Sequence, residues 1–196
     1  MTVRGADDTE DEVNDVTVPP GPAASEDRRR TTRGRRGEAR FTCLGADAAP
    51  PFEAVTSASV VAVADDGRLV LADLARGLDL PGGHVQRGDA SAEETVRRET
   101  WEEVRAELAE PRLVEVIESD YFGPDDLTYM VIYVARVRRL APWTDGHESA
   151  GRVILPPDDF LARYRGRRPE LMRHLVTSAL ATLAGGSPAA PATERG

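Results

Sequence analysis

The sequence contains a single cysteine, no lysine and no long hydrophobic run. Because Cys43 has no second cysteine to pair with, an internal disulfide bond is excluded. No apolar stretch approaches the roughly 20 residues that a membrane-spanning helix needs, and the first residues carry no hydrophobic segment of a signal peptide. The 25 basic residues are all arginine, a bias from which we infer no function. We therefore expect a cytoplasmic protein that has no membrane as a partner.

Positive charge is also in deficit, because 34 acidic and 25 basic side chains give a formal net charge of -9 at pH 7. A nucleic-acid-binding protein needs a basic surface for the phosphates, so this balance disfavours nucleic acid as a partner of the whole protein and favours cations. Hydrophobic residues make up 40% of the 196 positions, which suffices for the core of one globular unit.

Large apolar residues are scarce at both ends of the chain. Residues 1–40 run from an acidic stretch into an arginine-rich stretch, and residues 185–196 are mostly small or polar. Neither segment can bury enough apolar surface to offset the entropy lost on folding, so we expect both to be disordered. The arginines could bind an acidic partner or nucleic acid, or they could be a solvated run that pairs with the acidic stretch. We favour the second interpretation.

Two pairs of strands are indicated in the middle of the chain. Residues 57–64 and 68–74 are rich in aliphatic residues and flank a turn signal of sequence Asp-Asp-Gly at residues 65–67, which is typical of a hairpin. Residues 112–122 and 127–137 form the second expected pair, separated by a Gly-Pro-Asp-Asp segment.

Two helices are indicated as well. Ser91 followed by Glu94 has the spacing of a capping box, in which each side chain satisfies a backbone N–H of the first turn. A buried helical stripe then recurs at every fourth position, at Val96, Thr100, Val104 and Leu108. A second helix is expected to begin at Pro169, because proline suits the first helical position. The order of strands and helices predicts an α/β fold in which helices cover a mixed β-sheet.

A cluster of glutamates marks the first of these helices. On a helical wheel Glu99, Glu102 and Glu103 share one face, and Glu103 borders the apolar stripe. Like charges at this spacing repel each other by roughly 0.2–0.5 kcal/mol per pair. A divalent cation would offset the repulsion, and oxygen ligands suit Mg²⁺ or Mn²⁺. A hydrated surface helix without any metal explains the same residues, and this alternative stays open.

A glycine-rich segment precedes the glutamate helix, with Gly82, Gly83 and Gly88 in a loop that ends where the helix begins. Glycine lets the backbone approach a phosphate closely, and a helix N-terminus favours negative charge. A strand, a glycine loop and a carboxylate-bearing helix in direct succession provide the parts that can hold a metal–diphosphate complex.

At these residues the sequence resembles the Nudix hydrolase family, whose motif reads G-x5-E-x7-R-E-U-x-E-E-x-G-U with U aliphatic. The matching residues, within the segment Gly83–Ala106, are Gly83, the pair Arg98-Glu99 and the pair Glu102-Glu103. The resemblance implies a Nudix domain over about residues 55–184, built as an α/β/α sandwich with a mixed β-sheet.

The sequence departs from the family motif in three ways. One residue more than the motif allows lies before Arg98, so the loop glutamate is matched by Asp89 or by Ala90, and we prefer Asp89 with a one-residue insertion. Thr100 replaces an aliphatic residue. Arg105 stands where the family has a glycine after the helix, so we expect the helix to continue beyond it.

The resemblance implies a metal-dependent hydrolase that cleaves a diphosphate linkage in a nucleotide or nucleotide-sugar type of substrate. It implies that Glu99, Glu102 and Glu103 ligate Mg²⁺ or Mn²⁺ and that Arg98 orients these glutamates. The family often draws a further carboxylate from a distant loop, and Glu148, next to His147, is the candidate here. A plain surface position for Glu148 also stays open.

Substrate contacts are expected from the glycine loop, at Gly82, Gly83 and His84, although His84 could equally serve to fill the loop. Aromatic side chains near predicted loops could stack on a base, namely Tyr121, Phe122 and Trp143. Tyr129 lies within an apolar strand, so we expect it in the core. The expected partner is a small nucleotide-type molecule, and a homodimer is left open.

A second function of a different class stays open, because a Nudix-like module could sense a nucleotide without cutting it. The complete set of Glu99, Glu102 and Glu103 favours the enzyme. Asp89 in place of a glutamate and Arg105 in place of a glycine favour the sensor.

Overall fold

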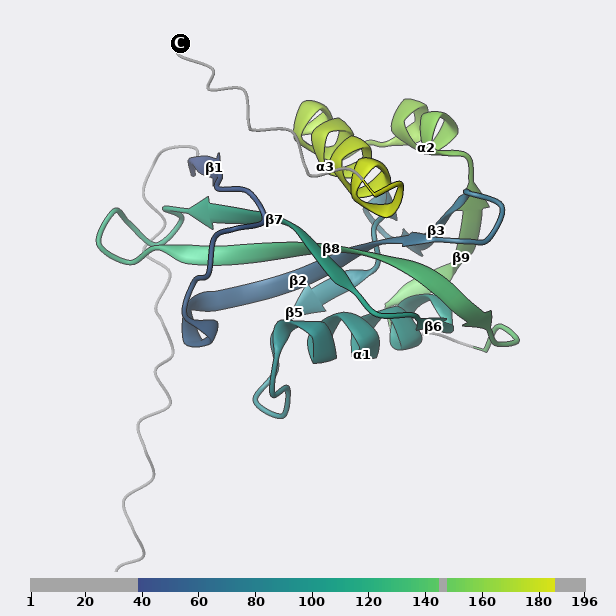
Figure 1. Ribbon diagram of the computed structural model, residues 1–196, viewed down its shortest axis with the longest axis horizontal. Helices are drawn as coiled ribbons and strands as arrows, with labels where there is room; N and C mark the ends of the chain where they lie inside the picture. The colour runs from purple at the N-terminus through teal and green to yellow at the C-terminus, as the bar shows by residue number, and fades with distance from the viewer. Residues whose placement is uncertain (1–38, 145–147, 186–196) are drawn as a thin grey trace, which may run out of the picture. The chain divides into compact units, whose positions relative to one another are not determined.

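The computed structural model describes residues 39–144 and 148–185, and a β-sheet forms the middle of this part of the chain. Two helices lie on one face of the sheet, α2 (Pro157–Arg163) and α3 (Pro169–Leu183), and α1 (Ala92–Val104) lies on the other (Figure 1). The predicted α/β/α sandwich is therefore confirmed. The predicted tails, apart from residues 39–40 and 185, lie outside the described residues.

The sheet is mixed, because β2 and β8 run parallel while the other paired strands run antiparallel. Its strands follow the order β1-β7-β8-β2-β3-β4, and β5, β6 and β9 pair with β2, β8 and β3 respectively. The strands are β1 (Phe41–Cys43), β2 (Val55–Val63), β3 (Leu69–Leu74), β4 (Gly77–Asp79), β5 (Gly82–His84), β6 (Ala106–Leu108), β7 (Arg112–Ser119), β8 (Thr128–Leu140) and β9 (Ser149–Leu155). A 3-10 turn, Phe52–Ala54, precedes β2.

Both predicted strand pairs are present. β2 and β3 form the expected hairpin, in which Gly67 takes a φ of 85° and its N–H donates to the carbonyl of Ala64 over 3.0 Å. β7 and β8 pair antiparallel, but β7 ends at Ser119. Tyr121 and Phe122, predicted at the end of this strand, lie instead in the turn that follows, where the N–H of Gly123 donates to the carbonyl of Asp120.

Apolar side chains fill the spaces on both faces of the sheet. Val96 and Val104 of α1 are fully buried against one face, and Phe160 of α2 and Val176 of α3 are buried against the other. Each fully buried side chain of this size contributes roughly 1.5–3 kcal/mol. Because helices cover both faces, residues 60–63 of β2 are all buried and do not alternate with exposed positions.

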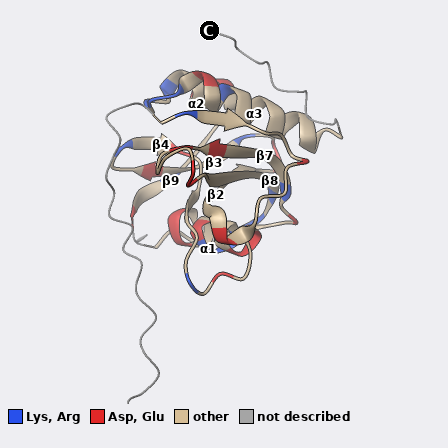
Figure 2. Cartoon of the chain, turned by 90° about the vertical axis from the view of Figure 1, so that its left-hand side faces the viewer, with Lys and Arg blue, Asp and Glu red and all other residues tan. Residues whose placement is uncertain are grey.

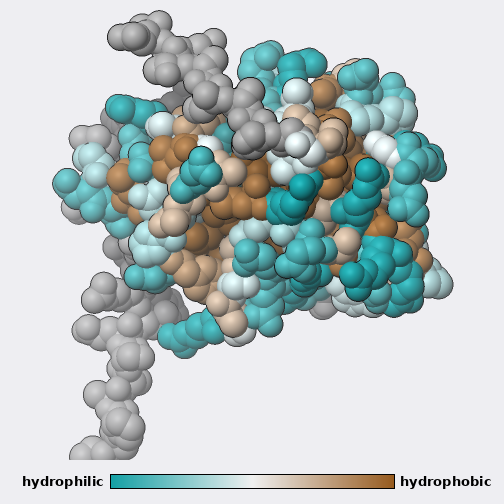
Figure 3. All heavy atoms as spheres, viewed as in Figure 1, coloured by the Kyte–Doolittle hydropathy of each residue, from teal (hydrophilic) through white to brown (hydrophobic). Residues whose placement is uncertain are grey.

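Acidic and hydrophobic side chains lie on different parts of the surface. Acidic side chains gather on α1 (Figure 2). Hydrophobic side chains are visible across the middle of the face shown in Figure 3, with hydrophilic side chains around them. No helix among the described residues combines the length and the apolar character needed to cross a membrane.

The prediction that the glutamate helix continues beyond Arg105 is wrong. α1 ends at Val104, and Arg105 takes a left-handed conformation with φ 51° and ψ 42°. Its N–H still donates to the carbonyl of Trp101 over 3.1 Å, and the next residues form β6, which pairs with β8. The left-handed residue reverses the chain from the helix into this strand. Arg105 thus adopts the conformation that glycine favours, at a cost of roughly 1–2 kcal/mol.

Candidate functional site

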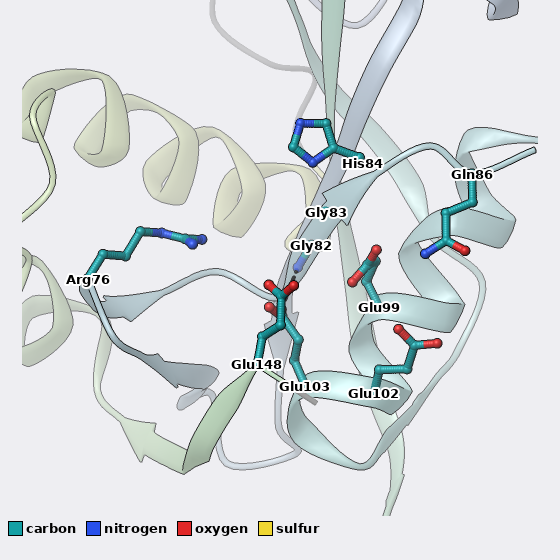
Figure 4. A pocket seen from close by; sticks show the side chains of 9 residues that line it. All are labelled: Arg76, Gly82, Gly83, His84, Gln86, Glu99, Glu102, Glu103 and Glu148. Atoms are coloured by element: carbon teal, nitrogen blue, oxygen red, sulfur yellow. Dashed lines mark hydrogen bonds between the residues drawn. The ribbon is translucent and has the colours of Figure 1, made fainter. Parts of the chain in front are cut away.

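A pocket of about 500 Å³ lies beside α1 and contains most of the residues that the sequence singled out. Figure 4 shows the carboxylates of Glu99 and Glu103 from α1 and of Glu148, just before β9, which face a common space. The described residues that line the pocket are Arg76, Gly82, Gly83, His84, Gln86, Glu99, Glu102, Glu103 and Glu148.

The start of α1 fixes the direction in which the glutamates project. Ser91 is the N-cap, and its hydroxyl accepts a hydrogen bond from the N–H of Glu94 over 3.2 Å. The Glu94 carboxylate in turn accepts from the N–H of Ala90 over 2.6 Å. The predicted capping interaction is therefore present, with Ala90 as the second donor, one residue earlier than in the usual capping box.

Gly82 and Gly83, which were predicted in a loop, lie instead in β5, the short strand between the glutamate helix and β2. A Cβ atom at Gly82 would collide with the backbone of Ala58 and Ser59, and a Cβ atom at Gly83 would collide with the carboxylate of Glu99. These glycines are therefore required by close packing of the site itself. Their small size lets the helix carboxylates approach the backbone of β5.

Glu103 is the most buried of the pocket carboxylates, with only 5% of its surface exposed. Burial raises its pKa to about 7, and the nearby Glu99 carboxylate acts in the same direction. The N–H of Gly82 donates to Glu103 Oε2 over 2.9 Å and partly offsets this rise. The prediction that Glu103 borders the buried stripe is confirmed, and its charge is poorly compensated by the protein alone.

Arg98 contacts two of the pocket carboxylates and also links α1 to the end of β5. Its Nη1 donates to Glu99 over 2.7 Å and to Glu102 over 3.3 Å, and its Nη2 donates to the carbonyl of His84 over 3.1 Å. Nε and Nη2 both donate to Asp89, over 3.1 Å and 2.8 Å. One guanidinium thus fixes the rotamers of two pocket glutamates.

Asp89 is oriented by three groups and stands outside the pocket lining. It accepts from Arg98, from the N–H of Gln86 over 2.9 Å and from the hydroxyl of Thr95 over 2.8 Å. The Arg98 guanidinium is the largest cause that holds the pKa of this carboxyl well below its usual range. Of the two positions weighed for the loop acid, Asp89 and Ala90, Asp89 is the one whose side chain contacts Arg98.

Sequence reasoning missed Arg76 and Gln86 in this pocket. Arg76 lies in the turn between β3 and β4, and its Nε donates to Asp79 over 3.0 Å while its side chain remains 63% exposed. It is the cation of the described pocket lining, so it can contact an anionic group bound there. The signal was weak, because a single arginine in a turn just before the glycine loop is usually only a solvated side chain.

The aromatic candidates lie elsewhere. Tyr121 and Phe122 form an edge-to-face pair with ring centroids 5.1 Å apart, and neither lines the pocket, nor does Trp143. Tyr129 packs against the core on the α1 side, as predicted. His147 falls outside the described residues.

The donor set of the pocket suits hard divalent cations. It offers carboxylate oxygens on three neighbouring helical positions and a fourth carboxylate from another segment. A bound cation would also compensate the buried charge of Glu103, for which the described residues provide one backbone N–H as a donor.

Comparison with known proteins agrees with this arrangement. The family model described as NUDIX domain matches residues 54–175. A search of curated proteins found no match. Among solved structures, a mutant form of the pyrophosphohydrolase BsRppH of Bacillus subtilis is similar, with a TM-score of 0.59 and 19% identity over 74% of this chain and 90% of that chain.

Two further structures resemble this chain. The NUDIX domain of NrtR from Shewanella oneidensis, complexed with ADP ribose, has a TM-score of 0.54 and 17% identity over 66% of this chain and 88% of that chain. A UDP-X diphosphatase has a TM-score of 0.52 and 16% identity over 71% of this chain and 67% of that chain. At these identities the likeness shows the fold, whereas the family model covers more than half of the sequence. The chain therefore belongs to the Nudix family.

Proposed function

We propose that this protein is a metal-dependent hydrolase that cleaves a diphosphate linkage in a nucleoside diphosphate derivative. The observation that carries the proposal is the gathering of Glu99, Glu102, Glu103 and Glu148 around one pocket of about 500 Å³. This volume lies within the usual range for small-molecule sites.

Three residues of α1 would hold the metal, Mg²⁺ or Mn²⁺. Glu99 and Glu102 are oriented by Arg98, and Glu103 is oriented by the N–H of Gly82. When bound, the metal neutralises charge on the diphosphate and lowers the pKa of a coordinated water. Arg98 acts as a positioning residue, because its guanidinium contacts the carboxylates and is not part of the pocket lining.

The remaining pocket residues have proposed roles on the substrate side. Glu148 is exposed just before β9 and faces the α1 carboxylates, so it can accept a proton from the attacking water. Arg76 can bind a phosphate oxygen. His84, with Gly82 and Gly83, borders the space in which the diphosphate would lie.

The substrate is proposed to be a small nucleotide or nucleotide-sugar. The similar structures are a pyrophosphohydrolase, a NUDIX domain complexed with ADP ribose and a UDP-X diphosphatase, and they set the first compounds to test. We would incubate the full chain with nucleoside triphosphates, ADP-ribose and UDP-sugars in Mg²⁺ or Mn²⁺, and measure released phosphate, pyrophosphate and nucleotide. Cleavage that needs the metal and disappears in Glu103→Gln supports the proposal, and no cleavage of any compound contradicts it.

A second candidate function is a module that binds a nucleotide without cutting it. Asp89 favours it, because the shorter side chain replaces the glutamate of the family motif and is fully engaged with Arg98, Thr95 and Gln86. Arg105 does not favour it, since this residue adopts the left-handed conformation expected of the glycine it replaces. This function predicts no product in the same assay, and its nucleotide binding would appear as a rise in melting temperature.

A further inference from the structure

A second group of metal-ligating side chains lies far from the pocket, on the face of the sheet that α3 covers. It consists of Cys43 on β1, Glu115 on β7 and His174 on α3. One ligand atom from each residue, the thiol sulfur, a carboxylate oxygen and an imidazole nitrogen, lies within 4.8 Å of the other two. Three of the four pocket glutamates, Glu99, Glu102 and Glu103, belong to α1, which lies on the opposite face (Figure 1).

Glu115 is the centre of this cluster. Only 2% of its surface is exposed. One carboxylate oxygen, Oε1, accepts from the N–H of Gly45 over 2.5 Å and from the N–H of Val116 over 3.1 Å. The other oxygen, Oε2, lies 2.9 Å from Nε2 of His174. Backbone donors thus fix the carboxylate so that one oxygen is directed at the histidine, which is how surrounding hydrogen bonds orient metal ligands.

The strand that carries Cys43 is held beside α3 by independent contacts. The guanidinium of Arg168, at the start of α3, lies 4.3 Å from the ring centroid of Phe41, and its Nη2 donates to the carbonyl of Ala39 over 3.0 Å. Cys43 itself packs against the small apolar cluster formed by Ile117, Ile132 and Leu175. The thiol and the imidazole are therefore brought together by the packing of β1 and α3.

We propose that Cys43, Glu115 and His174 form a zinc site with water as the fourth ligand, which ties β1 and α3 to β7. Sulfur, nitrogen and oxygen donors together suit Zn²⁺, and a hard ion such as Mg²⁺ would not take a thiolate. Tetrahedral zinc with bond lengths of about 2.0–2.3 Å separates its ligand atoms by roughly 3.3–3.7 Å. Small side-chain rotations bring atoms that already lie within 4.8 Å to this spacing.

Charge and access also agree with a zinc ion. On binding, the Cys43 thiol releases its proton to solvent, so a thiolate and a carboxylate balance the two positive charges of zinc, and His174 binds as the neutral imidazole. The complex buried beside the apolar cluster is then uncharged, which limits the cost of desolvation. The His174 side chain is 33% exposed, so an ion and a water molecule can reach the site from solvent.

The alternative is a cluster that binds no metal, in which Glu115 and His174 form a hydrogen-bonded pair and Cys43 is only a half-buried thiol. Burial and the Glu115 carboxylate raise the pKa of Cys43 to about 11, so without a metal this thiol stays neutral at physiological pH. A neutral thiol is a poor nucleophile, which disfavours a redox-reactive cysteine at this place.

The sole cysteine of the chain allows a direct test. Titration of the metal-free full-length protein with Co²⁺ should produce a thiolate-to-cobalt charge-transfer band whose final intensity corresponds to one thiolate-bound ion per chain, and Zn²⁺ should remove it by displacement. Carboxylates in the α1 pocket cannot give this band, because they contain no sulfur. The variant Glu103→Gln should therefore retain the band at full intensity, which separates this site from the proposed catalytic metal.

Two variants of the site and one control complete the test. Cys43→Ser should abolish the band, and His174→Ala should weaken Co²⁺ binding by at least tenfold. Arg173→Gln, on the neighbouring and exposed helix position, should bind as wild type does. Zinc should raise the melting temperature of wild type and of the control by more than that of Cys43→Ser, which keeps only the α1 pocket as a cation site.

A measurement on the wild-type protein alone can refute the proposal. Absence of the band in the wild-type protein at saturating Co²⁺ would overturn it. A band with one ion per two chains that persists in His174→Ala would also overturn it, because the cysteine would then bridge two molecules.

Discussion

The two faces of the sheet each bury a glutamate, and the two glutamates have opposite surroundings. Glu103, on the α1 side, is 5% exposed and has Glu99 as a neighbour, with one backbone N–H as a donor among the described residues. Glu115, on the α3 side, is 2% exposed and is met by two backbone N–H groups and by His174. Without any metal, Glu115 thus has three hydrogen-bond partners among the described residues, whereas Glu103 has one and lies beside a second carboxylate.

This difference predicts that the two buried charges affect the stability of the metal-free protein in opposite ways. A buried charge with complete hydrogen bonding is compatible with stability, and its loss leaves unsatisfied donors. A buried charge beside other carboxylates opposes folding until a ligand compensates it. The contrast between Glu103 and Glu115 can be tested by substitution, beginning with the largest expected effect.

The first prediction concerns pH and the metal-free protein. Glu103 has a pKa of about 7 when folded, against 4.5 for an ordinary glutamate. Between these values the folded state binds more protons than the unfolded state, so stability falls as pH rises from about 4.5 to about 7. The loss attributable to Glu103 is on the order of 3 kcal/mol at most.

Urea unfolding of metal-free wild type and Glu103→Gln across this pH range measures the effect. The variant has no titrating group at this position, so its stability relative to wild type should increase as pH rises. Parallel curves for the two proteins would show that the Glu103 charge is not disfavoured by folding.

The second prediction concerns Glu115. Replacing it by Gln removes a charged acceptor from two backbone N–H groups and from His174. We expect a loss of about 2 kcal/mol in the free energy of unfolding, measured without metal at pH 7. Under the same conditions Glu103→Gln should be as stable as wild type or more stable. Equal destabilisation by the two substitutions would remove the distinction between the two sites.

The third prediction concerns Glu148, which has the same chemistry but lies at the surface. Glu148→Gln should lower turnover by about tenfold or more if the carboxylate acts as a base, and should leave the melting temperature unchanged. Glu110→Gln is the matched control, because the Glu110 side chain is 88% exposed and pairs with Arg97 at 3.2 Å, away from the pocket. Unchanged kinetics in Glu148→Gln would show that this residue is an ordinary surface side chain with no part in the reaction.

The fourth and smallest effect concerns two buried threonines of α1. The hydroxyl of Thr100 has no hydrogen-bond partner among the described residues, whereas the hydroxyl of Thr95 donates to Asp89 over 2.8 Å. Thr100→Val should therefore stabilise the protein by about 1 kcal/mol, and Thr95→Val should destabilise it by a similar amount. Chemical denaturation of both variants measures this, and a loss of stability in Thr100→Val would mean that its hydroxyl is satisfied.

Sequence analysis predicted the elements that depend on local signals. The start of α1 at Ser91 follows from cap spacing, and the β2–β3 hairpin follows from its turn residues. The three-residue strands β1, β4, β5 and β6 have no such pattern, because they are strands only through pairing with their partners. Arg105 was misread for a related reason, since its left-handed conformation is imposed by the pairing of β6 with β8.

The α1 pocket and the cluster of Cys43, Glu115 and His174 also differ in how well the sequence predicts them. The carboxylates of α1 lie within one helical turn and a half, so their common face could be read from spacing alone. Glu115 and His174 are 59 positions apart, and Cys43 lies before the segment matched by the family model. Only the packing of β1, β7 and α3 brings these three residues together.

The central claim is that the α1 carboxylates are held for a divalent cation that serves hydrolysis. Thermal melts of wild type and Glu103→Gln, with and without Mg²⁺ and nucleotide, test it most directly when each sample is also assayed for product. Mg²⁺ at about 100 times its dissociation constant should stabilise wild type by about 2.7 kcal/mol and the variant much less, and only wild type should release product. Melting curves of wild type that do not respond to Mg²⁺, together with the absence of product, would contradict the claim.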